Sequence, residues 1–145
     1  MLESAVLTPI QFLVMERPDP QVDLGPVDCS VSLVVSDLDQ PDEPIIYATE
    51  SFCSLTGYSM SEIIGRNCRF LQSPPSSQPA SAIKQRNEGP VDVVRKAVES
   101  RQEVQQKIIN YKKSGQQFTN MLTLVHIYVE EDDANYAVGF VVEVD

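Results

Sequence analysis

The sequence predicts an α+β fold, in which a five-stranded antiparallel sheet carries short helices on one face and follows an N-terminal cap. Three observations lead to this fold class. The length of 145 residues suits one compact domain. Two strand-like segments come first, helix-like segments follow, and three strand-like segments end the chain. Prolines set off the beginning of the chain, so we expect a cap and strap over residues 1–28 and one domain over residues 29–145.

The cap is predicted to be a short helix followed by an extended strap. Pro9 suits the first turn of a helix, and Pro18 prevents that helix from continuing. The apolar side chains that share one helical face are Ile10, Leu13 and Val14. This face has to be buried either on the chain's own domain or on a second copy of the chain, and both alternatives stay open.

The domain begins with two predicted strands, residues 29–37 and 45–48, which a polar turn joins into a hairpin. Side chains two positions apart in a strand share a face. One face of the first strand carries Val31, Leu33 and Val35, and the other carries Ser32, Val34 and Ser36.

Short helices are predicted between the two groups of strands. The first covers residues 50–55. The second opens at a capping box formed by Ser59 and Glu62. A proline-rich loop that ends at Pro90 precedes the third helix, at residues 91–100, where valines and an alanine form an apolar stripe.

Three strands are predicted at the end of the chain, at residues 104–112, 117–129 and 136–144. Short polar segments separate them. Because consecutive strands joined by short turns pair as hairpins, we expect them to complete an antiparallel sheet.

Two asparagines lie on a strand face that is otherwise mostly apolar. If the turn between their strands is centred on Gly115, Asn110 lies opposite Asn120. A buried amide without a partner costs about 1–3 kcal/mol, so two explanations stay open. Either the amides bond to each other or to the backbone, or a planar heterocycle with an imide edge bonds to both.

The segment Gly65–Gln72 places Cys68 between two arginines, which favours its thiolate form. A buried apolar role for this cysteine is the alternative. A nucleophile formed with His126 is a weaker hypothesis, because no oxyanion hole is evident. Arg69 and Arg95 together suit a phosphate or pyrophosphate, and solvation on the surface is the alternative for either.

Composition and charge exclude several classes of function. Hydrophobic residues make up 42% of the chain, as in a globular domain. The net charge of −10 repels nucleic-acid phosphates and anionic membranes, so we expect no direct nucleic-acid or membrane partner. The chain has no apolar run that could span a bilayer and no basic secretory start. Three cysteines and one histidine suggest neither a disulfide framework nor a metal site, so the expected location is cytoplasmic and/or nuclear.

The segment Gly65–Gln72, with the sequence GRNCRFLQ, resembles the flavin-binding signature of light-oxygen-voltage (LOV) domains, the blue-light-sensing branch of the PAS superfamily. The resemblance covers essentially all of residues 29–144. Residues 17–28 are similar to the cap of short fungal LOV photoreceptors of the Vivid/Envoy type. The chain is therefore identified as a fungal LOV-domain blue-light photoreceptor of that type.

The resemblance implies a flavin photoreceptor without enzymatic activity. FAD is the expected cofactor and FMN the alternative, because residues 73–89 resemble an insertion that makes room for adenine. Cys68 is expected to form a reversible adduct with flavin carbon C4a while N5 gains a proton. The polar residues expected to bind the flavin are Asn67, Arg69, Gln72, Arg95, Asn110 and Asn120. The apolar residues expected beside its ring are Val34, Val94, Leu124 and Val141.

One position departs from the family pattern. Val141 stands where most LOV domains have a glutamine, whose amide responds to protonation of flavin N5. Valine cannot form that hydrogen bond. We therefore expect a water or a strand backbone group to take over the relay, coupled to movement of the cap around residues 18–26.

The expected output is a changed protein–protein surface. The resemblance implies light-dependent homodimerisation, or competition for a LOV partner of the white-collar transcription type, which would modulate light-responsive transcription in photoadaptation. The alternative is a PAS-type flavin or redox sensor that signals through oxidation of Cys29 and dimerisation.

Overall fold

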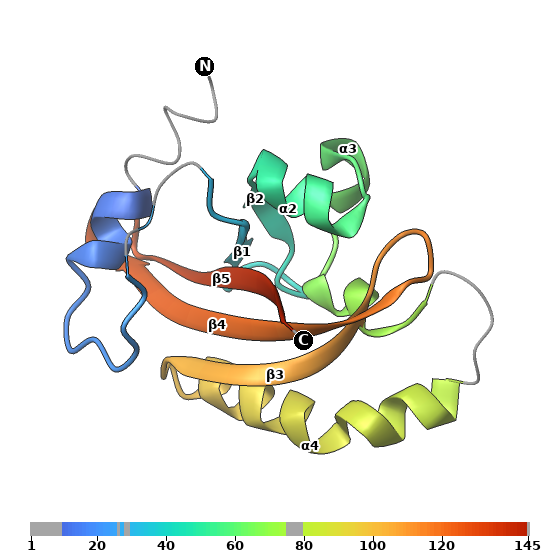
Figure 1. Cartoon of the computed structure of the whole chain (residues 1–145). Helices are drawn as coiled ribbons and strands as arrows, with labels where there is room; N and C mark the ends of the chain where they lie inside the picture. Colours follow the sequence, from blue (N-terminus) through green and yellow to red (C-terminus); the bar gives the residue numbers. More distant parts are fainter. Residues whose placement is uncertain (1–9, 26, 28–29, 75–79, 145) are drawn as a thin grey trace.

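A computed structural model describes residues 10–25, 27, 30–74 and 80–144 of the chain. Five strands form one antiparallel sheet in the order β2-β1-β5-β4-β3 (Figure 1). The strands are β1 (Leu33–Asp37), β2 (Ile45–Ala48), β3 (Val104–Tyr111), β4 (Gln117–Val129) and β5 (Ala134–Val144). The predicted α+β layout, with two strands, a block of helices and then three strands, is confirmed.

The first hairpin forms as its sequence predicts, with Val34 of β1 opposite Ala48 of β2. The alternation in β1 is also observed. Leu33 and Val35 pack into a core on one face of the sheet, whereas Val34 and Ser36 line a cavity on the other face. The strand itself begins at Leu33 rather than at the predicted residue 29.

Two short helices follow their local signals. Helix α2 (Glu50–Thr56) ends at Gly57, which adopts the left-handed conformation with φ +82° that glycine tolerates without strain. Helix α3 (Met60–Ile63) begins at the predicted capping box, in which Ser59 and Glu62 bond to each other's backbone N–H groups.

Helix α4 (Ala80–Glu99) is longer than predicted, because the expected loop before residue 91 is already helical. Pro90 lies inside the helix. A proline inside a helix removes one backbone hydrogen bond and favours a kink, which is why Pro90 predicts a helix boundary. The preceding segment is rich in Ala, Lys, Gln, Arg and Glu, all good helix formers, and here their propensity prevails.

A 3-10 helix, η1 (Cys68–Gln72), was not anticipated. The side-chain oxygen of Asn67 caps it by accepting a hydrogen bond of 2.9 Å from the N–H of Arg69. This short helix carries Cys68 and places it over the sheet.

The pairing of β3 with β4 corrects the predicted register. Asn110 lies opposite Phe118, and Asn120 lies opposite Ile108, so the two asparagines are diagonal neighbours. The reason is the turn: Gly115 closes a three-residue loop with φ +90° and is not its centre. A shift of two residues keeps both side chains on the predicted face.

The apolar face of the N-terminal helix, residues 10–15, is buried on the chain's own sheet. Val14 is fully buried, and Val27 of the strap packs into the same core as Val138 and Phe140 of β5. In Figure 1 this helix lies beside the β4 and β5 end of the sheet. Of the two alternatives, the apolar face of this helix is therefore buried on the chain's own domain and not on a second copy of the chain.

The strap is held by a buried carboxylate. Glu103, just before β3, pairs with Arg17 and also accepts hydrogen bonds from the N–H groups of Gln21 at 2.9 Å and Val22 at 3.0 Å. Both charged side chains are less than a tenth exposed. We call Arg17, Gln21, Val22 and Glu103 the Glu103 clasp.

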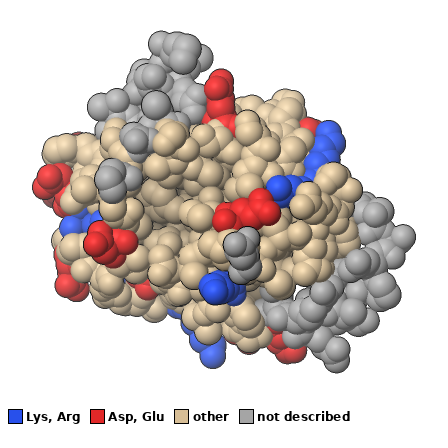
Figure 2. All heavy atoms as spheres, viewed as in Figure 1, with Lys and Arg blue, Asp and Glu red and all other residues tan. Residues whose placement is uncertain are grey.

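Charged side chains lie in small, separate groups on the face shown in Figure 2, with acidic and basic residues interspersed. The net charge of −10 is therefore not concentrated at one place on the described part of this face.

Candidate functional site

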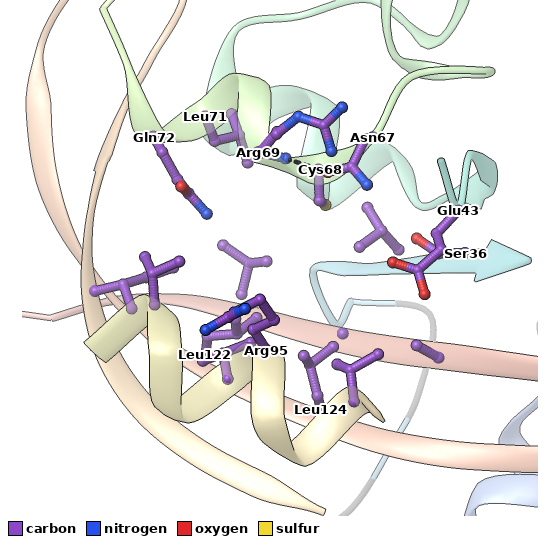
Figure 3. A pocket seen from close by; sticks show the side chains of 18 of the residues that line it. Ser36, Glu43, Asn67, Cys68, Arg69, Leu71, Gln72, Arg95, Leu122 and Leu124 are labelled. Atoms are coloured by element: carbon purple, nitrogen blue, oxygen red, sulfur yellow. Dashed lines mark hydrogen bonds between the residues drawn. The ribbon is translucent and has the colours of Figure 1, made fainter. Parts of the chain in front are cut away.

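A cavity of about 450 Å³ lies between the inner face of the sheet, η1 and α4 (Figure 3). Its volume lies within the usual range for small-molecule sites. All the residues that the sequence predicted for the site line it: Val34, Asn67, Cys68, Arg69, Gln72, Val94, Arg95, Asn110, Asn120, Leu124 and Val141. They come from six separate elements and from the residue before η1, and the fold brings them to one place.

Other lining residues were not predicted for the site. Ile108 and Leu122 lie on the same strand faces as the two asparagines, so strand parity was a sufficient signal for them. Glu43 and Ser36 line the cavity from the first hairpin. No local sequence pattern marks Glu43, because the turn that carries it is placed by tertiary contacts.

The side chain of Cys68 points from η1 into the cavity, and Leu122 and Leu124 of β4 lie across the cavity from it (Figure 3). Burial raises the pKa of its thiol to about 12, from an ordinary value of 9.0. The expectation that neighbouring arginines favour a thiolate was therefore wrong.

The two neighbouring guanidinium groups are engaged elsewhere. That of Arg66 lies 4.4 Å from the ring centre of Phe70, and that of Arg69 pairs with Asp42. Desolvation therefore prevails, and Cys68 is a neutral thiol at physiological pH.

The two buried asparagines form a connected pair. Asn120 Nδ2 donates a hydrogen bond of 2.9 Å to Asn110 Oδ1, and Asn110 Nδ2 donates one of 3.0 Å to the carbonyl of Ile109. Asn120 Oδ1 accepts a bond of 3.2 Å from the N–H of Val142. These bonds use one N–H of each amide, and an amide nitrogen carries two. The pair can therefore bind a further acceptor in the cavity.

Gly139 keeps the floor of the cavity flat. A Cβ at this position would lie 3.1 Å from Leu124 Cδ2 and 3.3 Å from Val34 Cγ2. Glycine inside a strand often marks such a close approach. With Val141 beside it, the floor offers an apolar surface against which a planar ring can stack.

Polar and charged groups occupy the opposite rim. Arg69 bonds to Asp42, and Arg95 bonds to Asp92 at 2.8 Å, and both arginines are more than half exposed. The side chain of Gln72 extends into the cavity in Figure 3. Guanidinium groups at a rim suit an anionic tail such as a phosphate.

One candidate residue is not brought to the cavity, and another lies outside the described residues. His126 hydrogen-bonds to Asn135 Oδ1 at 2.8 Å and does not line the cavity, so the nucleophile formed with Cys68 is not supported. Cys29 lies outside the described residues.

Among the described residues, no group of three or more His, Cys, Asp or Glu side chains is placed to hold a metal ion. The helices described include none with the length and apolar character to cross a bilayer.

A family profile described as PAS domain matches residues 30–145. The light-state dimer structure of the fungal blue-light photoreceptor Vivid is 44% identical, with a TM-score of 0.84 over 94% of this chain and 93% of that chain. The structure of a fungal LOV-domain photoreceptor described as integrating blue light and oxidative stress is 44% identical, with a TM-score of 0.83 over 94% of this chain and 90% of that chain.

Among curated proteins, White collar 1 protein of Neurospora crassa is 42% identical over 133 residues, which are 91% of this chain and 11% of that protein. Blue light receptor lreA of Aspergillus flavus is 40% identical over 131 residues, which are 90% of this chain and 15% of that protein. The chain thus spans only a small part of the length of these relatives.

A light-oxygen-voltage domain structure described with a flavin analogue is 35% identical, with a TM-score of 0.66 over 79% of this chain and 78% of that chain. The cavity fits a flavin. A flavin combines a flat ring, a pyrimidine edge with imide groups and an anionic tail. The flat floor at Gly139 suits the ring, and the amides of Asn110 and Asn120 suit the pyrimidine edge. The arginines at the rim suit the anionic tail.

Proposed function

The chain belongs to the PAS-domain family as a LOV blue-light photoreceptor domain similar to Vivid, and from this premise we propose that blue light makes Cys68 bond reversibly to a bound flavin. The domain is a photoreceptor rather than an enzyme. The observation that carries the proposal is the neutral, desolvated thiol of Cys68 directed into the cavity toward the flat floor.

A bound flavin would supply light absorption and, when excited, an electrophilic C4a=N5 bond. Cys68 would supply the S–H proton for N5 and the sulfur for a single bond to C4a. The reaction would be an addition, so it would need no external oxidant or reductant. In darkness the sulfur–carbon bond would break and the proton would return to Cys68. A thiol with a raised pKa suits this role because it keeps the proton that N5 must receive.

FAD is the proposed cofactor, with FMN as the alternative. Arg69 and Arg95 stand at the rim and can bind the phosphates, for which the guanidinium geometry is well suited. Asn67 and Gln72 are proposed to bind the ring and the ribityl chain, and Asn110 and Asn120 the pyrimidine edge.

The proposed output runs through β5 to the cap. Gly139 and Val141 line the cavity, whereas Val138 and Phe140, on the other face of β5, contact the core that holds the cap. A shift of β5 on adduct formation would therefore loosen the cap, proposed as residues 1–28, from the photosensory domain, proposed as residues 29–145.

We expect this shift to expose a surface for homodimerisation or for a LOV partner of the white-collar type, and so to modulate light-responsive transcription. The likeness to a light-state dimer of Vivid and to White collar 1 protein supports this direction.

A pair of absorption spectra tests the photochemistry. The purified protein should be yellow, lose its blue absorption under illumination and recover in darkness. Cys68→Ala should remove the reversible bleach while keeping the colour, and Cys53→Ala, a change to a half-buried cysteine of α2 outside the cavity lining, should keep both. A yellow wild-type protein that does not bleach would favour a flavin or redox sensor instead.

A further inference from the structure

The charges around the cavity do not add up to a positive site. Among the described residues, two arginines and two glutamates are the charged residues that line it: Arg69, Arg95, Glu43 and Glu99. Each arginine also pairs with an aspartate outside the lining, Asp42 or Asp92. With these partners included, negative charges outnumber positive ones at the mouth of the cavity. An anionic ligand therefore meets arginines that are already paired, and two further carboxylates.

Glu43 is the more enclosed of the two glutamates. It is half-buried, whereas Glu99, the last residue of α4, is exposed. In Figure 3 the side chain of Glu43 lies beside Ser36, with its carboxylate on the cavity side. No described residue pairs with this carboxylate or donates a hydrogen bond to it. Its charge is therefore available to act on a ligand.

The turn between β1 and β2 holds Glu43 close to Arg69. Asp42 and Glu43 both adopt the left-handed conformation, with φ +64° and +49°. The carbonyl of Asp42 accepts a hydrogen bond of 2.8 Å from Asn67 Nδ2, and its carboxylate pairs with Arg69. Asp42 thus fixes the turn on η1, and the next residue, Glu43, lines the cavity.

A phosphate bound to Arg69 comes within range of the Glu43 charge. It takes the place of the Asp42 carboxylate, and consecutive Cα atoms are about 3.8 Å apart. The phosphate and the Glu43 carboxylate then lie within roughly 10 Å, about one Debye length at moderate salt. Their repulsion grows with the charge of the phosphate. A terminal phosphate carries close to two negative charges at neutral pH, whereas each phosphate inside a diphosphate bridge carries one.

We propose that Glu43 is a specificity-determining residue of this cavity, whose carboxylate selects against flavins that end in a free phosphate. FMN ends in such a phosphate. Riboflavin has none, and FAD carries its two phosphates between riboflavin and adenosine. Glu43 therefore favours FAD over FMN by charge. This inference rests on the proposed function, because it takes a flavin as the ligand.

Fluorescence titrations of the flavin-free protein with riboflavin, FMN and FAD in darkness test the proposal. Glu43→Gln keeps the shape of the side chain and removes its charge. It should strengthen FMN binding about 5-fold and FAD binding about 2-fold, and it should leave riboflavin binding unchanged. The gain for FMN should shrink at high salt. Glu131→Gln, at an exposed glutamate outside the cavity lining, is the matched control and should change none of the three affinities.

Two further variants separate the charge of Glu43 from its contacts. Glu43→Lys reverses the charge, so it should strengthen FMN binding about 25-fold, the square of the gain from neutralisation. In an Asp42→Asn background, Glu43→Gln should still give its own 5-fold gain. The reason is that Glu43 repels the phosphate directly and does not act through the pair of Asp42 with Arg69.

Equal gains for riboflavin and FMN would overturn the proposal, since riboflavin has no charge for Glu43 to repel. Unchanged FMN affinity in both Glu43 variants would do the same, and so would loss of the gain in the Asp42→Asn background. If the wild-type protein binds the three flavins but does not bleach under blue light, the proposed photochemistry fails. The titrations then still decide the role of Glu43.

Discussion

Arg69 of η1 donates hydrogen bonds of 2.6 and 2.7 Å to the two carboxylate oxygens of Asp42, in the turn between β1 and β2. The two side chains are 60% and 61% exposed. An ion pair this exposed adds little to the free energy of unfolding. A phosphate that binds Arg69 has to displace this carboxylate, and Asp42 is therefore a competitor at the rim of the cavity.

Asp42→Asn should strengthen binding of phosphate-bearing flavins. The substitution removes the competing charge, and exposed ion pairs of this kind are worth up to about 1 kcal/mol, or about 5-fold in affinity. Fluorescence titration with FMN and with riboflavin, which lacks the phosphate, measures the difference. The FMN gain should shrink at high salt. An equal gain for riboflavin would show that Asp42 acts on cavity shape and not on charge.

Asn120→Ala should destabilise the flavin-free protein by about 1–3 kcal/mol, because Asn110 loses its buried partner. Chemical denaturation measures this loss. Replacing both asparagines by leucine should recover most of the stability, since no unpaired amide remains, yet flavin should not bind. Flavin retention by the double variant would show that the amides do not bind the ring.

Gly139→Ala should reduce flavin loading while the protein still folds. The added methyl group approaches Leu124 and Val34 within 3.1 and 3.3 Å, which narrows the space above the cavity floor. Gly89→Ala is the control, because nothing lies within 4 Å of its added Cβ. The flavin-to-protein absorbance ratio after saturation and gel filtration gives the readout. Full loading of the Gly139 variant would mean that the ring does not lie against this floor.

The Glu103 clasp should open in acid. Burial alone would raise the pKa of Glu103, but hydrogen bonds from Arg17 and from the N–H groups of Gln21 and Val22 outweigh it and lower the pKa below the ordinary 4.5. A lowered folded-state pKa means that the stabilisation is present above about 4.5 and is lost as pH falls through the folded value. Hydrogen exchange of residues 10–25 should therefore accelerate in acid.

Glu103→Gln should produce the same loss of protection at neutral pH and cost about 3 kcal/mol, because Arg17 is left buried without its counter-charge. Glu130→Gln, at an exposed position, provides the control. Unchanged exchange in the Glu103 variant would show that the apolar core, and not the clasp, holds the strap.

The yield of the light-induced bleach should show no titration near pH 9. With the pKa of Cys68 raised to about 12, the thiol stays protonated across the range in which an ordinary cysteine ionises. Bleaching at matched light doses between about pH 6 and 10 checks this expectation. A sigmoidal change centred near 9 would indicate a thiol with an ordinary pKa and contradict the raised value.

The alternation of side chains along the strands predicts most of the cavity residues that the sequence alone could identify. It placed Val34, Asn110, Asn120 and Leu124 on one face, and the structure finds all four around the cavity. The register of β3 and β4 was wrong by two residues, because it depends on which residue of the turn takes a positive φ. A shift of two residues leaves each side chain on the same face of the strand, so the predicted face is confirmed although the predicted pairing is wrong.

The remaining errors concern properties that only the folded chain has. The ionisation of Cys68 depends on desolvation by distant segments and on the partners that Arg66 and Arg69 find. Pro90 predicts a helix boundary, but it lies inside α4, because a local proline signal does not by itself decide whether the flanking segment is helical.

Strand β5 presents the cavity on one side and the anchor for the N-terminal helix on the other. A foreign peptide could be grafted in place of residues 10–25, with an apolar side chain at the position of Val14. Light would then control whether that peptide stays docked on β5, and the cavity residues would be unchanged. The strength of that anchor would then set the contrast between the illuminated and dark states of the engineered switch.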